Sequence, residues 1–156
     1  MEALLKSFGH KLARPSLLSK ASLIGGKEAA VSGKSINIVD PGSKDGRVIA
    51  TVAECTDSQV NEAVAAAKKA LDDWSTTDPM IRSEVFEQAE ELVRQNRKDL
   101  SLIIAAEGGK VLREAEAEVD NVIGTFEHYS KYLCDNAGKL VGERLSKHRE
   151  VRWMPL

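Results

Sequence analysis

Cysteines are few in this 156-residue chain, and long apolar runs and broad basic stretches are absent from its sequence, which excludes several classes of protein. Two cysteines, Cys55 and Cys134, cannot build a disulfide framework, and no CxxC pair or closely spaced histidines suggest a zinc site. No apolar run approaches the roughly 18–20 residues of a membrane span. Basic residues are scattered among acidic ones at a net charge of −2, which argues against nucleic acid as a partner. We therefore expect a soluble, cytoplasmic protein that binds neither nucleic acid nor membrane.

The first twenty residues are richer in basic residues than in acidic ones. Lys6, Lys11, Arg14 and Lys20 stand against Glu2 alone, with serine and leucine between them. This composition is mildly similar to a mitochondrial transit peptide, which leaves the mitochondrial matrix as an alternative location. Because Glu2 weakens that pattern, residues 1–20 are predicted to be a leader that is flexible or loosely docked, with weak targeting as the alternative.

Residues 25–41 contain two Gly-Lys pairs, the second followed by a serine, which raises the possibility of a phosphate-binding loop. Such a loop would need a glycine where this chain has Glu28, and a helix directly after the serine. Residues 35–39 instead alternate between polar and apolar types, as a strand does. The turn and strand of a hairpin are therefore the favoured interpretation.

Residues 21–53 are predicted to form an antiparallel β-ribbon or small meander. Short apolar runs at 22–24, 35–39 and 47–52 are separated by Gly25-Gly26 and by the turn-rich segment 40–46.

From about residue 57 to residue 137 the apolar period becomes helical. Thr56 and Gln59 form a capping-box pair before a predicted helix over 57–73. The apolar residues expected on one face of this helix are Val60, Ala63, Val64, Ala67, Leu71 and Trp74.

Two further helical segments are predicted. One begins at Thr77-Asp78-Pro79, is interrupted over the polar residues 96–98, and ends at Gly108-Gly109. The other runs from Leu112 to a stop at Gly138. A strand is expected at about 149–154, and no partner for it is evident except the N-terminal ribbon.

The reactive side chains do not assemble into an evident active site. Cys55 precedes a helix N-terminus, which can lower the pKa of a thiol, but no histidine lies nearby as its base, so a small buried residue is favoured. Cys134 lies beside the apolar stripe of its predicted helix and is interpreted as a packed residue. His10, His128 and His148 are isolated and fit surface or core-edge positions. The carboxylates Glu116 and Asp120 are expected to project into solvent.

Five segments form a recognisable series along the chain. They are Ile24-Gly-Gly-Lys27, Ile36-x-Ile-Val-Asp-Pro41, Gly46-Arg-Val-Ile-Ala-Thr-Val52, Asp57-x-x-Val-x-x-Ala-Val-x-Ala-Ala66 and Ile104-Ala-Ala-Glu-Gly-Gly-Lys-Val-Leu-x-Glu-Ala115. In this order and spacing they resemble the N-terminal part of the NAD(P)-dependent aldehyde dehydrogenases. The departures from the family pattern include Glu28, where tryptophan is common, and Val111, where proline is usual.

The resemblance implies an α/β aldehyde dehydrogenase fold, of which residues 21–156 would be an incomplete part. This part would be mostly α-helical, with the N-terminal antiparallel β-ribbon and a C-terminal strand. It also implies an oxidoreductase that uses NAD or NADP to oxidise an aldehyde, and oligomer contacts with other aldehyde dehydrogenase subunits. Residues 14–27 are similar to the succinate-semialdehyde dehydrogenase subgroup.

The family's Gly-Gln-x-Cys nucleophile and Glu-Leu-Gly-Gly base motifs do not occur here, so no catalytic or cofactor-binding residue can be transferred. The chain alone is expected to be inactive and to bind no cofactor. By resemblance, the carbonyls of Ile38 and Val39 and the acid of Glu107 would hold a monovalent cation; alternatively, Glu107 braces the hairpin. A non-catalytic interaction module for full-length subunits, or an independent helical adaptor, are the rival interpretations.

Overall fold

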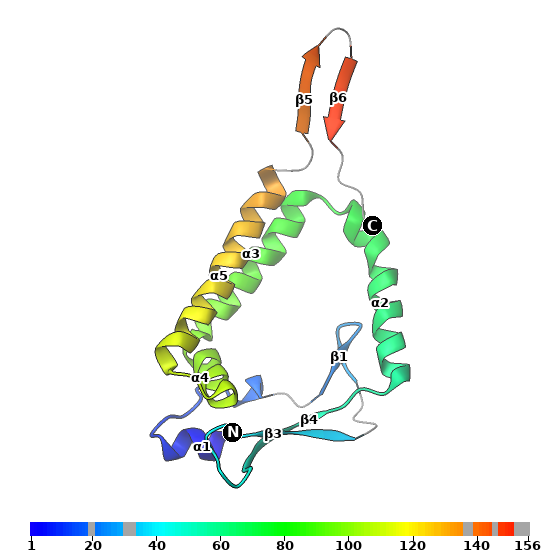
Figure 1. Ribbon diagram of the computed structural model, residues 1–156. Helices are drawn as coiled ribbons and strands as arrows, with labels where there is room; N and C mark the ends of the chain where they lie inside the picture. Colours follow the sequence, from blue (N-terminus) through cyan, green and yellow to red (C-terminus); the bar gives the residue numbers. More distant parts are fainter. Residues whose placement is uncertain (19–20, 30–33, 136–138, 145–146, 152–156) are drawn as a thin grey trace.

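The computed structural model describes residues 1–18, 21–29, 34–135, 139–144 and 147–151. Its elements form an open frame (Figure 1), in which helix α2 stands on one side and the paired helices α3 and α5 on the other. The strands β3 and β4 run along the base. Within the described residues, no helix combines the length and the apolar composition that crossing a bilayer requires.

The predicted ribbon consists of two separate hairpins. Strand β1 (Leu23–Ile24) pairs with β2 (Lys27–Glu28) around Gly25 and Gly26, whose positive φ angles suit the tight turn. Strand β3 (Ser35–Val39) pairs antiparallel with β4 (Val48–Ala53). Because Ser35 opens a strand instead of a helix, the phosphate-loop interpretation is excluded.

Helix α2 spans Asp57–Thr76, and its first turn is capped as predicted. The Thr56 hydroxyl accepts the Gln59 N–H at 3.3 Å, and the Gln59 side chain accepts the Thr56 N–H at 3.0 Å. Its predicted apolar face is not buried, since Val64 is 63% and Trp74 41% exposed. The β1–β2 hairpin touches this helix where Gly25 approaches Ala66.

Helices α3 (Pro79–Gln95) and α5 (Leu112–Asp135) pack along each other, as Figure 1 shows, and bury their facing sides. Val119 is 2% exposed, and the ring of Phe86 meets that of Phe126 edge-on at 5.8 Å between centroids. The buried Ser83 hydroxyl donates to the Ser130 carbonyl at 2.9 Å.

Helix α4 (Arg97–Gly108) begins after the interruption that the sequence predicts, at Asn96, and ends at Gly109 in the left-handed conformation. Its Arg97 makes a two-pronged ion pair with Asp120 of α5, at 2.6 and 2.7 Å. This hydrogen bond, aided by the Arg97 charge, lowers the pKa of Asp120. Asp120 and its neighbour Glu116, which lies 4.0 Å from Arg97, are therefore anchors for α4.

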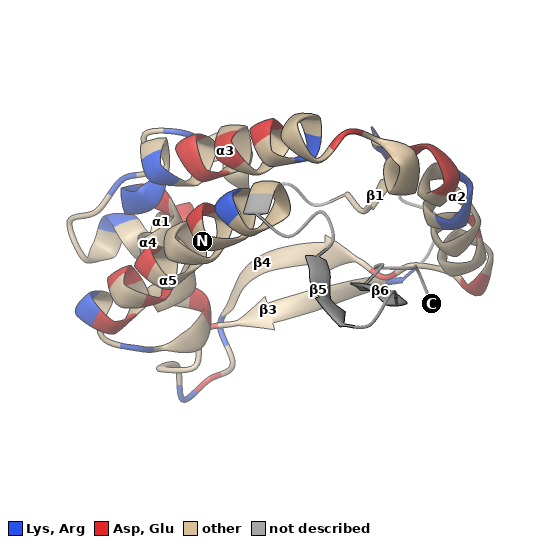
Figure 2. Ribbon diagram, turned by 90° about the horizontal axis from the view of Figure 1, so that it is seen from above, with Lys and Arg blue, Asp and Glu red and all other residues tan. Residues whose placement is uncertain are grey.

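Charged side chains are spread over the helices, whereas β3 and β4 carry almost none (Figure 2). Along α3 and α5 a few basic residues are interspersed among more numerous acidic ones. Such intermixing agrees with the expectation that this chain presents no broad basic face.

The first eighteen residues, called here the N-terminal segment, contain helix α1 (Glu2–Ser7) and a single 3₁₀ turn (Pro15–Leu17). Leu4, Leu5 and Leu12 are buried in one apolar cluster with Ile49 of β4 and Leu102 of α4. The segment is thus docked in this structure, while a targeting role for it stays a prediction.

The predicted C-terminal strand is the second arm of a hairpin. Strand β6 (Lys147–Val151) pairs antiparallel with β5 (Lys139–Arg144), and the two project from the frame (Figure 1). Its partner is thus β5, and not the N-terminal ribbon, which was the one candidate evident in the sequence. Strand β5 escapes prediction because Gly142 and the surrounding charges interrupt its alternation. Residues 152–154 of the expected strand lie outside the described residues.

Candidate functional site

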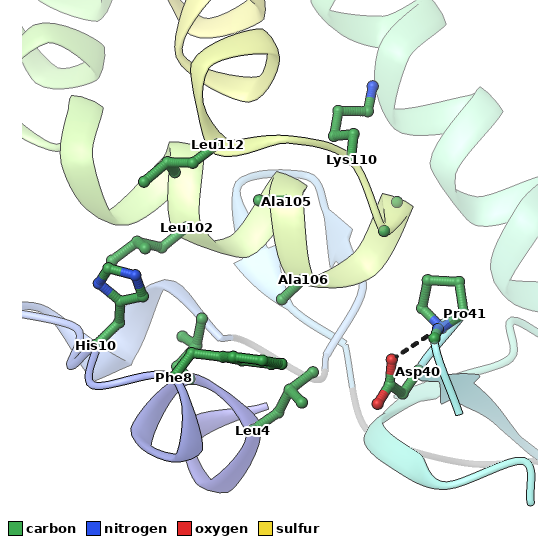
Figure 3. A pocket seen from close by; sticks show the side chains of 14 residues that line it. Leu4, Phe8, His10, Asp40, Pro41, Leu102, Ala105, Ala106, Lys110 and Leu112 are labelled. Atoms are coloured by element: carbon green, nitrogen blue, oxygen red, sulfur yellow. Dashed lines mark hydrogen bonds between the residues drawn. The ribbon is translucent and has the colours of Figure 1, made fainter. Parts of the chain in front are cut away.

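A hollow lies where the N-terminal segment, the β3–β4 turn and the end of α4 meet. It has a volume of about 570 Å³ (Figure 3). Leu4 and Phe8 lie on one side of it and Ala106 and Leu112 on the other. Its walls are therefore mainly apolar, and its polar groups come from three separate elements. These groups belong to His10, Asp40 and Lys110.

Asp40 is fixed in this wall by the turn that follows β3. Its carboxylate accepts the Gly42 N–H at 2.9 Å and the Arg47 guanidinium, and it is 8% exposed. The hydrogen bond from Arg47, followed by that from Gly42, lowers the pKa of Asp40. A charged carboxylate that accepts two hydrogen bonds in this way stabilises the turn, and it is poorly suited to donate a proton.

Lys110 and His10 complete the polar groups of the hollow. The Lys110 ammonium pairs with Glu118 of α5, so its charge is directed to that helix. His10 follows α1 and lies near Leu102 in Figure 3. The sequence offers one signal for this wall, the spacing of Leu4 and Phe8 on one helical face, but nothing that predicts which surface they meet.

A very close approach joins the β3–β4 turn to the end of α4. A Cβ atom built on Gly109 would lie 2.6 Å from Cγ of Pro41, and the φ angle of Gly109 is +63°. Glycine is needed here both for its backbone conformation and for the space. The contact brings the segment that contains Ile38 and Val39 next to the segment that contains Glu107.

The predicted cation ligands therefore come from neighbouring segments. Ile38 packs against the apolar cluster, whereas Val39 and Glu107 are exposed. The β3–β4 register shifts between Ile38 and Val39, and such a bulge frees carbonyl groups from the regular ladder. Carbonyls with one carboxylate suit a hard monovalent cation in their chemistry, and the site stays a prediction. Among the described residues, no group of three or more His, Cys, Asp or Glu side chains could hold a metal ion.

Both cysteines are exposed, which corrects the interpretation that each is a packed residue. Sγ of Cys55 lies 3.0 Å from Oγ of Ser22, and Sγ of Cys134 lies 3.5 Å from Sδ of Met80. Neither partner is a base that could activate a thiol for attack on a carbonyl. His128 instead stacks on Tyr132, with 6.1 Å between ring centroids, as a surface residue of α5.

Comparison with known proteins identifies the family. The model of the aldehyde dehydrogenase family matches residues 28–156, and the chain therefore belongs to this family. It is 34% identical over 120 residues to the D-glyceraldehyde dehydrogenase (NADP(+)) of Thermoplasma acidophilum, covering 77% of this chain and 24% of that protein. It is 30% identical to the mitochondrial succinate-semialdehyde dehydrogenase of Arabidopsis thaliana, covering 92% of this chain and 27% of that protein.

The fold agrees with solved structures of the same family. The succinate-semialdehyde dehydrogenase of Burkholderia pseudomallei superposes with a TM-score of 0.77 at 28% identity, over 85% of this chain and 27% of that one. The mostly helical arrangement with antiparallel strand pairs is thus part of the aldehyde dehydrogenase fold, as the sequence predicts. The chain spans about a quarter of the length of the curated relatives that it matches.

Proposed function

We propose that this chain is the N-terminal part of an NAD(P)-dependent aldehyde dehydrogenase that oxidises an aldehyde, or a semialdehyde, to the carboxylic acid. The observation that carries the proposal is the family match over residues 28–156. Two of its relatives are named as succinate-semialdehyde dehydrogenases, which supports the semialdehyde class of substrate.

The chain on its own is proposed to be inactive. Aldehyde oxidation in this family needs a thiolate to attack the carbonyl carbon, a bound NAD(P) to accept the hydride, and a base to assist hydrolysis of the thioester. The family's nucleophile and base motifs do not occur in these 156 residues. Cys55 and Cys134 have sulfur or hydroxyl neighbours instead of a base.

A direct assay tests this proposal. The purified chain is mixed with succinate semialdehyde, and separately with glyceraldehyde, in the presence of NAD⁺ or NADP⁺, and absorbance of the reduced cofactor is followed. No turnover above the protein-free rate is expected, while a full-length family member serves as the positive control. Turnover that is abolished by Cys55→Ser or by Cys134→Ser would overturn the proposal of inactivity.

The second candidate function is an interaction module that associates with full-length aldehyde dehydrogenase subunits. The exposed apolar face of α2, with Val64 63% and Val60 51% exposed, supports this candidate because such faces mark contact surfaces. Co-purification with a tagged full-length subunit would be expected, and Val64→Glu should weaken it, while Lys69→Glu, at an exposed position on the opposite face of α2, should not. Equal recovery of both variants would argue against a contact through this face.

Location and cation binding remain proposals. The cytoplasm is favoured, with the mitochondrial matrix as the alternative that the Arabidopsis relative illustrates.

The carbonyls of Ile38 and Val39 with the carboxylate of Glu107 are proposed to hold a monovalent cation. Glu107→Gln should then abolish the stabilisation that potassium or sodium chloride gives beyond that of an organic cation at equal ionic strength.

A further inference from the structure

The N-terminal segment supplies most of the buried apolar side chains at the junction between the β3–β4 hairpin and α4. Leu5 is 4% and Leu12 3% exposed. Their cluster partners Ile49 and Leu102 come from the two elements that meet at this junction. In Figure 1, α1 lies below α4 and beside the end of the hairpin. The segment therefore bridges two parts of the molecule that are distant in sequence.

A polar contact fixes the end of this bridge. Asp99, in the first turn of α4, is 4% exposed and uses both carboxylate oxygens. One oxygen accepts the N–H of Ala13 at 3.0 Å, and the other accepts the N–H of Arg14 at 2.6 Å. A buried carboxylate is costly unless it is hydrogen-bonded, and bonds from main-chain N–H groups to a charged acceptor are among the stronger kinds.

These two kinds of contact make different demands on the bound segment. The apolar cluster requires large aliphatic side chains at positions 4, 5 and 12, whereas Asp99 requires two consecutive free backbone N–H groups and no particular side chain. Residues 1–14 meet both demands at once. A proline at position 13 or 14 would remove one of the two donors.

We propose that α4, together with Ile49, forms a docking site for an apolar segment, and that the N-terminal segment of this same chain is its occupant. The carboxylate of Asp99, called here the latch, holds the segment in this site through its hydrogen bonds from Ala13 and Arg14. The docked segment clamps the β3–β4 hairpin to the helices, so the attachment of the hairpin depends on Asp99 as well as on the intervening chain.

Limited proteolysis of the complete 156-residue chain tests the latch. Trypsin can cut this segment after Lys6 and Lys11, but not after Arg14, which precedes Pro15, and cleavage requires the segment to leave its dock. Asp99→Ala should accelerate cleavage at these two positions by about tenfold or more, because local opening becomes more favourable when both hydrogen bonds are lost. Asp72→Ala, on an exposed position of α2, removes the same charge and should leave the rate unchanged.

Amide hydrogen exchange supplies an independent measurement. The N–H groups of Ala13 and Arg14 should be protected in the wild type and lose that protection in Asp99→Ala. Asp99→Asn, which keeps one acceptor oxygen, should give intermediate protection. Leu12→Ser should release the same segment through the apolar contact, and far-UV circular dichroism should show the helices retained in each variant.

Two results would overturn the proposal. One is an equal rate of cleavage after Lys6 and Lys11 in the wild type, Asp99→Ala and Asp72→Ala. The other is exchange of the Ala13 and Arg14 amides in the wild type at the rate of an unstructured peptide. If Asp99→Ala unfolds the chain, Asp99→Asn and Leu12→Ser take its place. Faster cleavage after Lys11 in both variants would support the proposal, and cleavage at the wild-type rate in both would overturn it.

Discussion

Helix α2 and the α3–α5 pair contrast sharply, although their sequences show the same kind of amphipathic pattern. The pair contains the buried residues Val119, Ile123 and Ser83, whereas α2 has no buried residue. The pattern in α2 is nevertheless regular, and its cap forms as predicted. An amphipathic stripe thus indicates that one face of a helix packs against a partner, but it does not indicate whether that partner belongs to the same stretch of chain. The exposed face of α2 agrees with what a partial family member is expected to show.

The largest difference between the two regions should appear on truncation of one apolar side chain in each. Ile123→Ala in α5 should lower the free energy of unfolding by about 2–5 kcal/mol, because Ile123 is 5% exposed and its loss leaves a cavity. Leu71→Ala in α2, where Leu71 is 40% exposed, should change it by less than about 0.5 kcal/mol. Urea denaturation followed by circular dichroism measures both. Similar losses in the two variants would show that α2 is packed in solution.

A smaller effect is expected from one buried hydrogen bond. Ser83→Ala removes the hydroxyl that donates to the Ser130 carbonyl and should cost about 1 kcal/mol. Ser75→Ala in α2 removes an exposed hydroxyl that donates to the Asp72 carbonyl at 3.1 Å, and it should be nearly neutral. The same denaturation measurement applies. A neutral Ser83→Ala would indicate that the α3–α5 contact is looser than the structure shows.

The ion pair between α4 and α5 should give a weak but pH-dependent effect. Because Arg97 lowers the pKa of Asp120 in the folded state, the pair stabilises the fold above the ordinary aspartate pKa of about 4, and the benefit is lost as pH falls through the lowered value. Asp120→Asn should therefore lower the urea midpoint at pH 7. It should leave the midpoint unchanged at a pH below the lowered pKa of Asp120. Asp73→Asn, at an exposed position of α2, is the matched control and should leave the urea midpoint at pH 7 unchanged. A shift that persists in acid would exclude the pair as its cause.

The smallest effect on stability is expected on the exposed face of α2. Val64→Ser should leave the urea midpoint unchanged, since Val64 is 63% exposed. It should still lower the fluorescence of a dye that binds apolar surfaces. Thr125→Ser, an exposed and already polar position of α5, should leave the dye signal as it is. Equal dye binding by both variants would place the apolar surface elsewhere on the chain.

Local chemistry was enough to predict most of the helical frame. The cap formed by Thr56 and Gln59, the Asp78-Pro79 start of α3 and the stop at Gly109 all act within one or two turns, so they can be read directly from neighbouring residues. Strand β5 could not be predicted because its residues do not alternate. Its pairing with β6 is set by the hairpin as a whole.

The candidate site was less accessible to sequence reasoning because its contacts are long-range. Nothing local to Asp99 indicates that its carboxylate receives the amides of Ala13 and Arg14. The docking of the N-terminal segment could not be predicted for the same reason, since a few leucines in a short basic stretch also suit a targeting sequence. Ile38, Val39 and Glu107 were reached through family resemblance, and what places their segments side by side is the contact of Pro41 with Gly109.

That contact has a genetic consequence. Every missense change at codon 109 introduces a Cβ atom that would collide with the ring of Pro41 and would also strain the backbone at a φ of +63°. Neither residue can move without a cost in stability, because Gly109 ends helix α4 and Pro41 is a cyclic residue in a tight turn. Substitution at this codon is therefore expected to be tolerated poorly in a population, even though Gly109 touches no reacting group.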